Sequence, residues 1–514
     1  MDTTPGPSAP RLACRTFPRE SFVVPDVHIF DPQHDVDVVG DLLVENGQVA
    51  AVGPGSNRPA GVEVLHDLAG CWVFPGFVDP HAHLRTPGFE YKEDLASGSL
   101  AAASGGYVAV VAMANTEPVI DSGPIAAWVL DQAEKEAVVR VGQVGSASKA
   151  QKGEELSEMR ELADAGVVAF SDDGKPISDA DLLLHVLRYA RGTRRPLLLH
   201  LENKSLSLDG VMHEGRWSAR LGLRGIPPAA ESGSLARDLE IVRYVDAEEK
   251  RLARFSGGGA AGRAASPVCR APLVHFQHLS AADSARLVRA AKEQGVPITA
   301  EVTPLHLLLT DERLTTFDQN LKVNPPIRSI EDRDALVAAL ADGTIDCVGT
   351  DHAPHAPHEK EVPIEEAASG SIGLETAFAA LHTGLVLTGK LSLARLVEAM
   401  SGGPCRVLGL EEPRLAVGSP ADFCVVDLEE PWVVTTATLR SKSRNSAFLG
   451  AEFIGRVRLT VVDGARRFSR GRGEARCIGE TFRATSCSRT ARSSRASDSP
   501  VPARWWVRWS STPA

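Results

Sequence analysis

The stretch Phe-Pro-Gly-Phe-Val-Asp-Pro-His-Ala-His-Leu-Arg spans residues 74–85 and carries an apolar, strand-like run into two histidines. Residues two apart in an extended chain face the same side, so His81 and His83 can bind one metal ion. Arg85 continues that face toward a substrate anion. Taken alone, a His-x-His pair fits a metal site and fits two ordinary surface or core histidines equally well. The rest of the chain decides between these interpretations.

Polar side chains also close five later apolar runs. Each can coordinate a metal, accept a proton or bind an anion; the runs are 107–113, 166–170, 196–199, 273–276 and 347–349, and the groups are Asn115, Asp172 with Asp173, His200, His278, and Asp351 with His352. Segments with helical spacing lie between the runs, such as 179–190 and 281–294. Strands that alternate with helices predict parallel βα units. In a closed βα barrel the carboxyl ends of all strands meet on one face, so these groups would converge there.

An Asp after a strand also has a purely structural interpretation, because it can cap the next helix. Asp172 and Asp179 both fit that role. The joint pattern of histidines and aspartates at several strand ends has no common packing reason, however. A site for two metal ions needs this set of nitrogen and oxygen ligands, so the pattern favours metal chemistry.

The motifs around these residues resemble the amidohydrolase superfamily and, within it, the type I dihydroorotases, from about residue 22 to about residue 468. They are Asp-Pro-His-Ala-His-Leu-Arg (79–85), Pro-Gly-Phe-Glu-Tyr-Lys-Glu-Asp (87–94), Ala-Asn-Thr-Glu-Pro (114–118), Phe-Ser-Asp-Asp-Gly (170–174), His-Leu-Glu-Asn (200–203), Asn-Pro-Pro-Ile-Arg (324–328), Gly-Thr-Asp-His-Ala-Pro-His (349–355) and Gly-Leu-Glu-Thr (373–376). The resemblance implies an α/β fold, a (β/α)8 TIM-type barrel over residues 74–410. A small composite β-sandwich would come from residues 21–73 and 411–468.

The same resemblance assigns the site. It implies one or two zinc ions, held by His81, His83, Asp173, His200, His278 and Asp351. Asp173 would bridge the metals, a bridging hydroxide would be the nucleophile, and Asp351 would be the general acid and base. The substrate residues would be Arg85, Asn115, Asn324, His355, Ser369 and Gly370.

The implied activity is the reversible cyclisation of N-carbamoyl-L-aspartate to L-dihydroorotate in pyrimidine synthesis. Arg85 suits this substrate, because a planar guanidinium grips a carboxylate with two parallel hydrogen bonds. One alternative is a hydantoinase or dihydropyrimidinase, but relatives of that kind bridge their metals with a carboxylated lysine where this chain has Asp173. Another is a non-catalytic scaffold for aspartate transcarbamoylase. Such scaffolds have lost metal ligands, whereas this chain keeps all six.

Four positions depart from the usual pattern of the family: Thr86, Ala114, Leu305 and Ser369. None of them removes a metal ligand. Ser369 stands where an aromatic side chain beside the substrate ring is common, so it could loosen the packing of that ring. Leu305 fits a core position next to a strand.

Composition agrees with this prediction. A chain of 514 residues with 43% hydrophobic residues can bury a barrel core and a second small domain. It has no long apolar stretch and no secretion signal, which predicts a cytoplasmic protein without a membrane partner. A net charge of −11 argues against nucleic acid as a partner. We expect a small-molecule substrate, a homo-oligomer and, as an open alternative, assembly with aspartate transcarbamoylase.

Three segments lie outside the predicted domains. Residues 1–20 are predicted to be a disordered lead-in, and 254–269 a flexible, glycine-rich insertion. Residues 469–514 carry nine arginines against three acids and are predicted to be a disordered tail. That tail is either a basic arm for an acidic partner or the product of a shifted reading frame, and the lack of a periodic apolar pattern favours the second.

Overall fold

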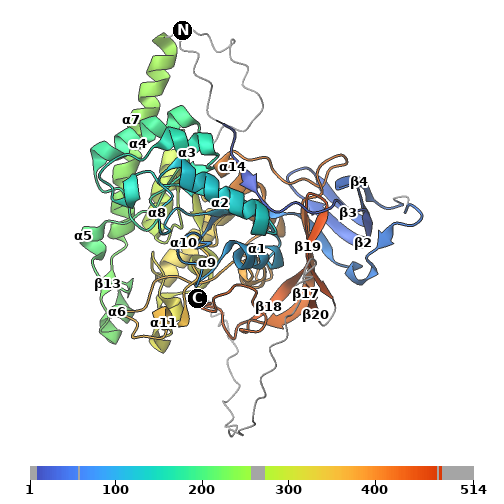
Figure 1. The fold of residues 1–514 in the computed structure, drawn as a ribbon. Coiled ribbons are helices and arrows are strands. Elements are labelled where there is room, and N and C mark those ends of the chain that lie inside the picture. The colour runs from blue at the N-terminus through green and yellow to red at the C-terminus, as the bar shows by residue number, and fades with distance from the viewer. Residues whose placement is uncertain (1–7, 56–57, 256–271, 472–473, 477–514) are drawn as a thin grey trace, which may run out of the picture. The chain divides into compact units, whose positions relative to one another are not determined.

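The computed structural model describes residues 8–55, 58–255, 272–471 and 474–476. Nearly all of the predicted insertion at 254–269 and most of the predicted tail fall outside these residues, so both calls stay predictions. The described residues form an α/β barrel and a separate mixed sheet (Figure 1).

Eight parallel strands form the barrel sheet, in an order that follows the chain. They are β7 (Phe77–Ala82), β8 (Tyr107–Ala112), β9 (Arg140–Gly145), β10 (Ala169–Phe170), β11 (Leu197–Leu199), β14 (Val274–Phe276), β15 (Ile298–Val302) and β16 (Cys347–Val348). The first and last strands meet through a bridge between Ala82 and His352, where the His83 amide donates to the His352 carbonyl at 2.8 Å. The sheet is therefore a nearly closed barrel. Its strands are almost wholly buried because both faces are covered.

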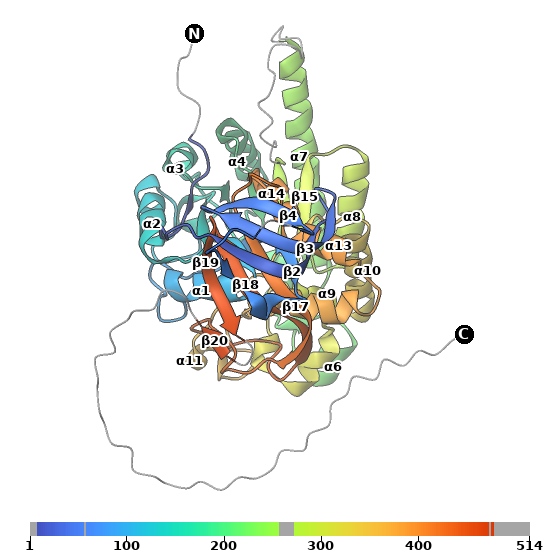
Figure 2. The same ribbon diagram turned by 90° about the vertical axis from the view of Figure 1, so that its right-hand side faces the viewer.

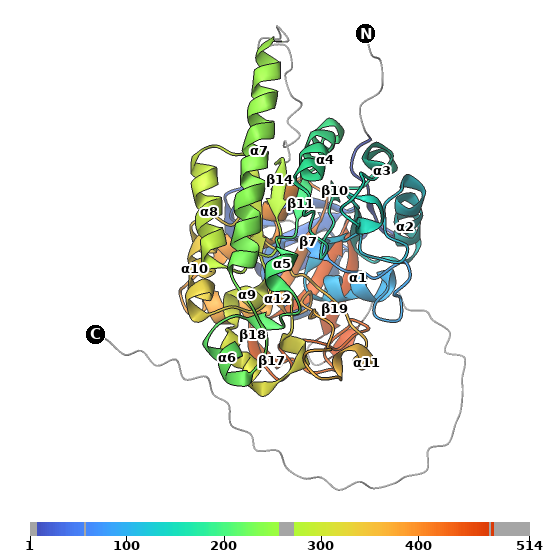
Figure 3. The same ribbon diagram turned by 90° about the vertical axis from the view of Figure 1, so that its left-hand side faces the viewer.

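Helices cover the outside of this barrel (Figure 3). The longer ones are α1 (Leu95–Ser104), α2 (Gly123–Glu136), α3 (Met159–Ala165), α4 (Ala180–Thr193), α7 (Ala229–Phe255), α8 (Ala282–Glu293), α10 (Ile330–Ala341), α13 (Leu393–Met400) and α14 (Gly402–Leu408). The segments predicted to be helical at 179–190 and 281–294 appear as α4 and α8. Asp179 caps α4, since its carboxylate accepts from the Leu182 amide at 2.8 Å.

Short elements fill the connections. They are β12 (Met212–His213), β13 (Gly225–Ile226), α5 (Lys204–Ser207), α6 (Arg216–Leu221), α9 (Pro304–Leu308), α11 (Pro357–Lys360), α12 (Ala377–Leu381), a π-helix at His382–Val386, and 3₁₀ helices at His66–Leu68, Lys149–Gln151, Asp311–Thr316 and Gln319–Leu321. Several of them follow the carboxyl ends of β11, β15 and β16, which places them around the mouth of the barrel.

Strands from both chain ends build the second sheet (Figure 2). They are β2 (Phe22–Asp31), β3 (Val36–Glu45), β4 (Gln48–Gly53), β5 (Glu63–Val64), β6 (Trp72–Pro75), β17 (Phe423–Val433), β18 (Glu452–Val462), β19 (Ala465–Gly471) and β20 (Glu474–Arg476). Strand β6 joins the two halves, because it pairs in parallel with β2 and antiparallel with β17. The predicted fold class is confirmed, and the composite part is one continuous hydrogen-bonded sheet.

Two predicted boundaries are wrong. Within residues 1–20, β1 (Leu12–Ala13) pairs with β9, and the Arg11 amide donates to the Gly166 carbonyl at 2.9 Å. Gly142, the partner of Leu12, makes this possible: a Cβ there would lie 2.9 Å from the Leu12 side chain. The predicted tail also starts too early, because the ladder of β19 and β20 continues the sheet beyond residue 469.

Candidate metal centre

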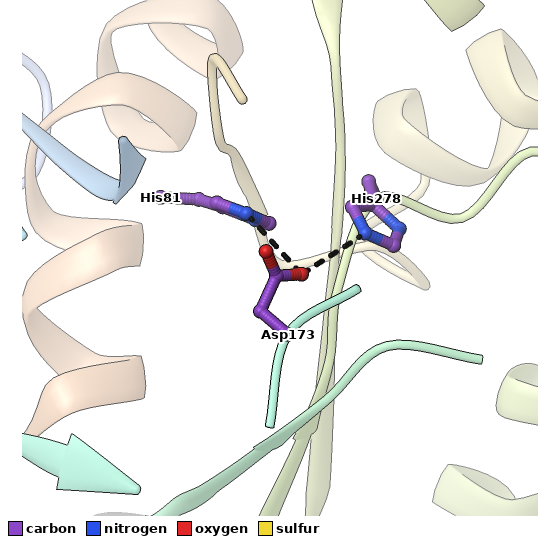
Figure 4. A group of neighbouring side chains, drawn as sticks. All are labelled: His81, Asp173 and His278. Carbon is purple, nitrogen blue, oxygen red and sulfur yellow. Dashed lines mark ion pairs between the residues drawn. The ribbon is translucent and has the colours of Figure 1, made fainter. Parts of the chain in front are cut away.

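Four histidines surround the carboxylate of Asp173 at the carboxyl ends of the barrel strands. Oδ1 of Asp173 lies 3.7 Å from Nε2 of His81 and 3.6 Å from Nε2 of His278 (Figure 4). The same oxygen lies 3.5 Å from Nδ1 of His200. Oδ2 of Asp173 lies 3.6 Å from Nε2 of His83. Two ligand atoms of one tetrahedral zinc ion stand about 3.4 Å apart when each metal–ligand distance is about 2.1 Å. These spacings therefore suit ligands of a shared ion better than hydrogen bonds.

Asp351 completes a second group with the two histidines of the opening motif. Its Oδ1 lies 3.1 Å from Nε2 of His83 and 3.6 Å from Nε2 of His81. Two sets of possible metal ligands thus share His81: one with Asp173 and His278, the other with His83 and Asp351. The structure brings together all six residues that the resemblance assigned to the metals.

The chemistry of these residues fits divalent ions. Nε2 of His81 and Oδ1 of Asp173 are buried and have no hydrogen-bond partner among the described residues. Burial disfavours the charged form of Asp173, but the charge of His81 and the contacts with His200 and His278 together outweigh this and hold the pKa of the carboxyl well below its usual range. The site therefore presents an ionised carboxylate beside a buried imidazole that ligates a metal once its Nε2 proton is released.

Glu301, on β15, is a site residue that the sequence analysis missed. Its Oε1 accepts from Nδ1 of His81 at 2.7 Å, and its Oε2 lies 3.1 Å from Nε2 of His275. The other nitrogen of His275 contacts the Thr299 hydroxyl at 2.9 Å. A carboxylate that binds one ring nitrogen of a ligating histidine fixes its tautomer and aims the other nitrogen at the metal. The signal for it in the sequence is an acid inside the strand-like stretch 296–302, before the end of that strand rather than after it.

Glu301→Gln should weaken metal binding by about 10- to 100-fold, because a neutral amide orients His81 less firmly. The measurement is a competition titration of the metal against a coloured chelator. Glu293→Gln, on the exposed side of α8, is the matched control and should bind metal like the parent protein. An unchanged metal affinity in Glu301→Gln would show that Glu301 only fills space.

Asn115 and Asn324, predicted to contact substrate, lie beside predicted metal ligands. Oδ1 of Asn115 is 2.9 Å from Nδ1 of His83. Asn324 donates to Glu202 at 3.0 Å, and the same carboxylate oxygen lies 3.2 Å from Nε2 of His200. Both asparagines therefore reach the ligand histidines, directly or through Glu202, which the sequence analysis also missed.

The remaining polar groups after strands have structural partners. Asp172 accepts from the Ser146 hydroxyl at 2.8 Å and from the amides of Ala147 at 2.8 Å and Ser148 at 3.1 Å. It thereby orders the loop after β9 and caps no helix. Nδ1 of His352 accepts from the Gly373 amide at 3.2 Å. Neither residue belongs to any of the three groups of possible metal ligands found among the described residues.

The predicted substrate residues Arg85, His355, Ser369 and Gly370 form one cluster beside the metal centre. Arg85 is buried, and its positive charge contributes to the lowered pKa of His83. Its Nε donates to the Pro354 carbonyl at 3.1 Å, and a terminal nitrogen lies 3.4 Å from Nε2 of His355. Burial lowers the pKa of Arg85 to about 10, so the guanidinium stays charged at neutral pH.

His355 is neutral, because burial and then the charge of Arg85 lower its pKa to about 3. Its Nε2 contacts the Ser369 carbonyl at 2.9 Å. Gly370 has φ +143°, and a Cβ there would lie 2.7 Å from the Ala353 side chain. Position 370, beside His355, therefore requires glycine. Leu305, one of the four departures, packs in an apolar cluster.

Comparison with known proteins gives consistent matches. Residues 72–467 match the family described as the Amidohydrolase family. A dihydroorotase of Geobacter sp. (strain M21) is 44% identical over 436 residues, which cover 85% of this chain and 96% of that protein. A dihydroorotase of Pelobacter propionicus is 43% identical over 444 residues, 86% of this chain and 98% of that protein.

Solved structures agree on the fold. An L-hydantoinase (dihydropyrimidinase) from Arthrobacter aurescens has a TM-score of 0.72 at 25% identity, and the alignment covers 90% of this chain and 98% of that one. A dihydropyrimidinase from Brevibacillus agri NCHU1002 has a TM-score of 0.72 at 22% identity, with 88% and 95% covered.

Proposed function

The chain belongs to the amidohydrolase family, and we propose that it is a dihydroorotase, which interconverts N-carbamoyl-L-aspartate and L-dihydroorotate. The convergence of all six predicted ligands beside a buried, charged Arg85 carries the proposal. The curated relatives named dihydroorotase support it, because their identity of 41–44% extends over 95% or more of their length. The enzyme is a hydrolase of cyclic amides in pyrimidine synthesis.

We propose zinc as the metal, held by the four histidines, Asp173 and Asp351. When bound, two zinc ions lower the pKa of a shared water and polarise the substrate carbonyl. Asp351 is ionised, because its contact with His83 outweighs the cost of burial and lowers its pKa. Its carboxylate is therefore placed to take a proton in the hydrolytic direction and to give it to the ring nitrogen that leaves.

Arg85 and its neighbours bind the substrate in this proposal. The Arg85 guanidinium, already ordered by the Pro354 carbonyl, grips the α-carboxylate that both substrates carry. His355 stays neutral and keeps a ring nitrogen for the same pocket. Positioning by fixed groups lowers the entropy cost of aligning the amide with the attacking water.

The alternatives are less well supported. The similarity to hydantoinases extends over the fold at 20–25% identity, and position 173 holds an aspartate where a lysine-bridged enzyme needs a lysine. A scaffold without activity is opposed by the complete and convergent ligand set. None of the helices in the described ranges is both long and apolar enough to cross a membrane. Cytoplasmic location, a homo-oligomer and assembly with aspartate transcarbamoylase stay predictions.

The proposal is tested by assaying the zinc-loaded chain with N-carbamoyl-aspartate, dihydroorotate, hydantoin and dihydrouracil. Activity on the two compounds that carry the α-carboxylate, and on neither of the others, is expected. Arg85→Gln should raise KM for dihydroorotate far more than it lowers kcat. Turnover of hydantoin or dihydrouracil at a comparable rate would favour the hydantoinase alternative, and no activity with bound zinc would favour the scaffold.

Lys360 holds the wall of the substrate pocket, so Lys360→Met should raise KM for dihydroorotate several-fold with a smaller change in kcat. Its buried ammonium donates to the carbonyls of Ala368 at 2.8 Å and Gly370 at 3.0 Å, on both sides of Ser369. The Ser369 carbonyl in turn orients His355. Steady-state kinetics check this. Lys152→Met, at an exposed site, is the matched control, and an equal effect in both variants would contradict the role of Lys360.

A further inference from the structure

A second polar pocket lies between the barrel and the mixed sheet, beside the amino end of β8. The pocket is small and opens to solvent. The barrel contributes Ser104 and Glu375 to its walls, and the sheet contributes Trp432, Arg456 and Arg470. The metal centre stands at the carboxyl ends of the same strands, so this pocket is separate from it.

Arg470, near the end of β19, brings an unpaired charge to this pocket. The residue is only 9% exposed, and its buried Nε has no hydrogen-bond partner. Within the part of the chain that the structure describes, its guanidinium makes neither a hydrogen bond nor an ion pair. The ring of Phe468, 5.3 Å away, faces it but cannot satisfy its N–H groups. Burying a charge without a counter-ion is costly, so this arrangement suggests a missing partner.

Other arginines surround Arg470. Leu459 pairs with Ser469 across β18 and β19, and continuing that register by one residue places Arg458 opposite Arg470. Like charges at opposed positions of a sheet repel each other. Arg456 and Arg458 share one counter-ion, Glu430, at 3.0 and 2.6 Å, and each still has a buried Nε without a hydrogen-bond partner in the described chain.

The charge balance of the pocket is positive. Burial, followed by the charges of Arg456 and Arg440, lowers the pKa of Arg470 to about 10. Glu375 does not serve as the missing partner. Its oxygens accept from the Ser104 hydroxyl at 2.9 Å and from the amides of Arg440 at 2.7 Å and Ser441 at 2.9 Å.

We propose that this pocket binds a small oxyanion, either inorganic phosphate or the phosphate group of an ester. Of the two arginines in its lining, Arg456 pairs with Glu430, whereas Arg470 keeps a positive charge to neutralise. Free guanidinium N–H groups match phosphate oxygens in geometry as well as in charge. The opening to solvent lets the rest of an ester stay outside.

The test is a calorimetric titration of the full, zinc-loaded chain with inorganic phosphate at constant ionic strength. Arg470→Met should weaken phosphate binding in the pocket at least tenfold, and Arg456→Met should act in the same direction. Arg286→Met, whose side chain is 68% exposed on α8, is the matched control and should bind like the parent protein. Any phosphate that binds at the metal centre contributes equally to the titrations of the parent protein and the three variants. A difference in phosphate affinity between these proteins therefore measures binding in the pocket.

Two further measurements keep the proposal testable if a variant folds poorly. Crystals of the parent protein soaked in selenate should show an anomalous peak beside Arg470. A parallel titration with glycerol 3-phosphate distinguishes the sources: binding of both anions indicates the phosphate group of a metabolite, and binding of phosphate alone indicates the free anion. Equal phosphate binding in the parent and Arg470→Met, or no selenate peak, would overturn the proposal.

Discussion

Asp351→Asn should lower kcat for ring closure about a thousandfold while the metal content stays at the parent value, because loss of a general acid and base costs about 10²- to 10⁴-fold. The amide keeps an oxygen that can ligate a metal, but it cannot carry the proton. The backbone also favours this choice of variant. Asp351 has φ +47°, and asparagine tolerates the left-handed region better than most other residues, so the strand end should keep its conformation.

Steady-state rates and elemental analysis of the purified variant check this expectation. Asp346→Asn is a suitable control, since Asp346 stands at the start of the same strand and pairs with Lys292 at 2.6 Å, away from the metals. It should lose some stability and keep its kcat. A variant Asp351→Asn with kcat within tenfold of the parent would show that another group moves the proton.

The fold could be predicted, and the six candidate metal ligands could be located, because both leave local marks in the sequence. Six of the eight barrel strands lie in short apolar runs that a polar side chain closes, so the position of His200 or His278 is visible without any long-range information. The common mouth of the barrel then follows from the parallel topology alone. The family motifs added which of the two aspartates at 172 and 173 faces the metals.

Contacts between distant strands could not be predicted in the same way. Glu301 meets His81 across 220 positions of sequence, and only the order and register of the barrel strands bring them together. The same is true of Lys360, because its role depends on its contacts with the carbonyls of Ala368 and Gly370, which lie in the loop that follows it. Strand β1 escaped prediction because its two residues pair at a glycine of another strand, and two residues carry no periodic signal.

Asp173→Ala should lower both the metal content and kcat, the latter at least a thousandfold, because this carboxylate is the group common to the four histidines. Its two oxygens lie within 3.7 Å of a ring nitrogen of each of them. Alanine removes the negative charge that offsets two cations at short range, so at least one ion should be lost from the purified protein. Elemental analysis and kinetics after loading with excess zinc measure both effects.

The matched control is Asp172→Ala, a substitution of the adjacent residue. We expect Asp173→Ala to lose metal and activity, and Asp172→Ala to lose stability. Removing the Asp172 carboxylate leaves the buried hydroxyl of Ser148 and the amides of Ala147 and Ser148 without their acceptor, which costs about 1–3 kcal/mol of folding free energy for each such group. Its melting temperature should fall while the metal content per folded chain stays at the parent value. Loss of metal in both variants would mean that the loop, rather than the Asp173 carboxylate, holds the ions, because only the loop is shared by the two residues.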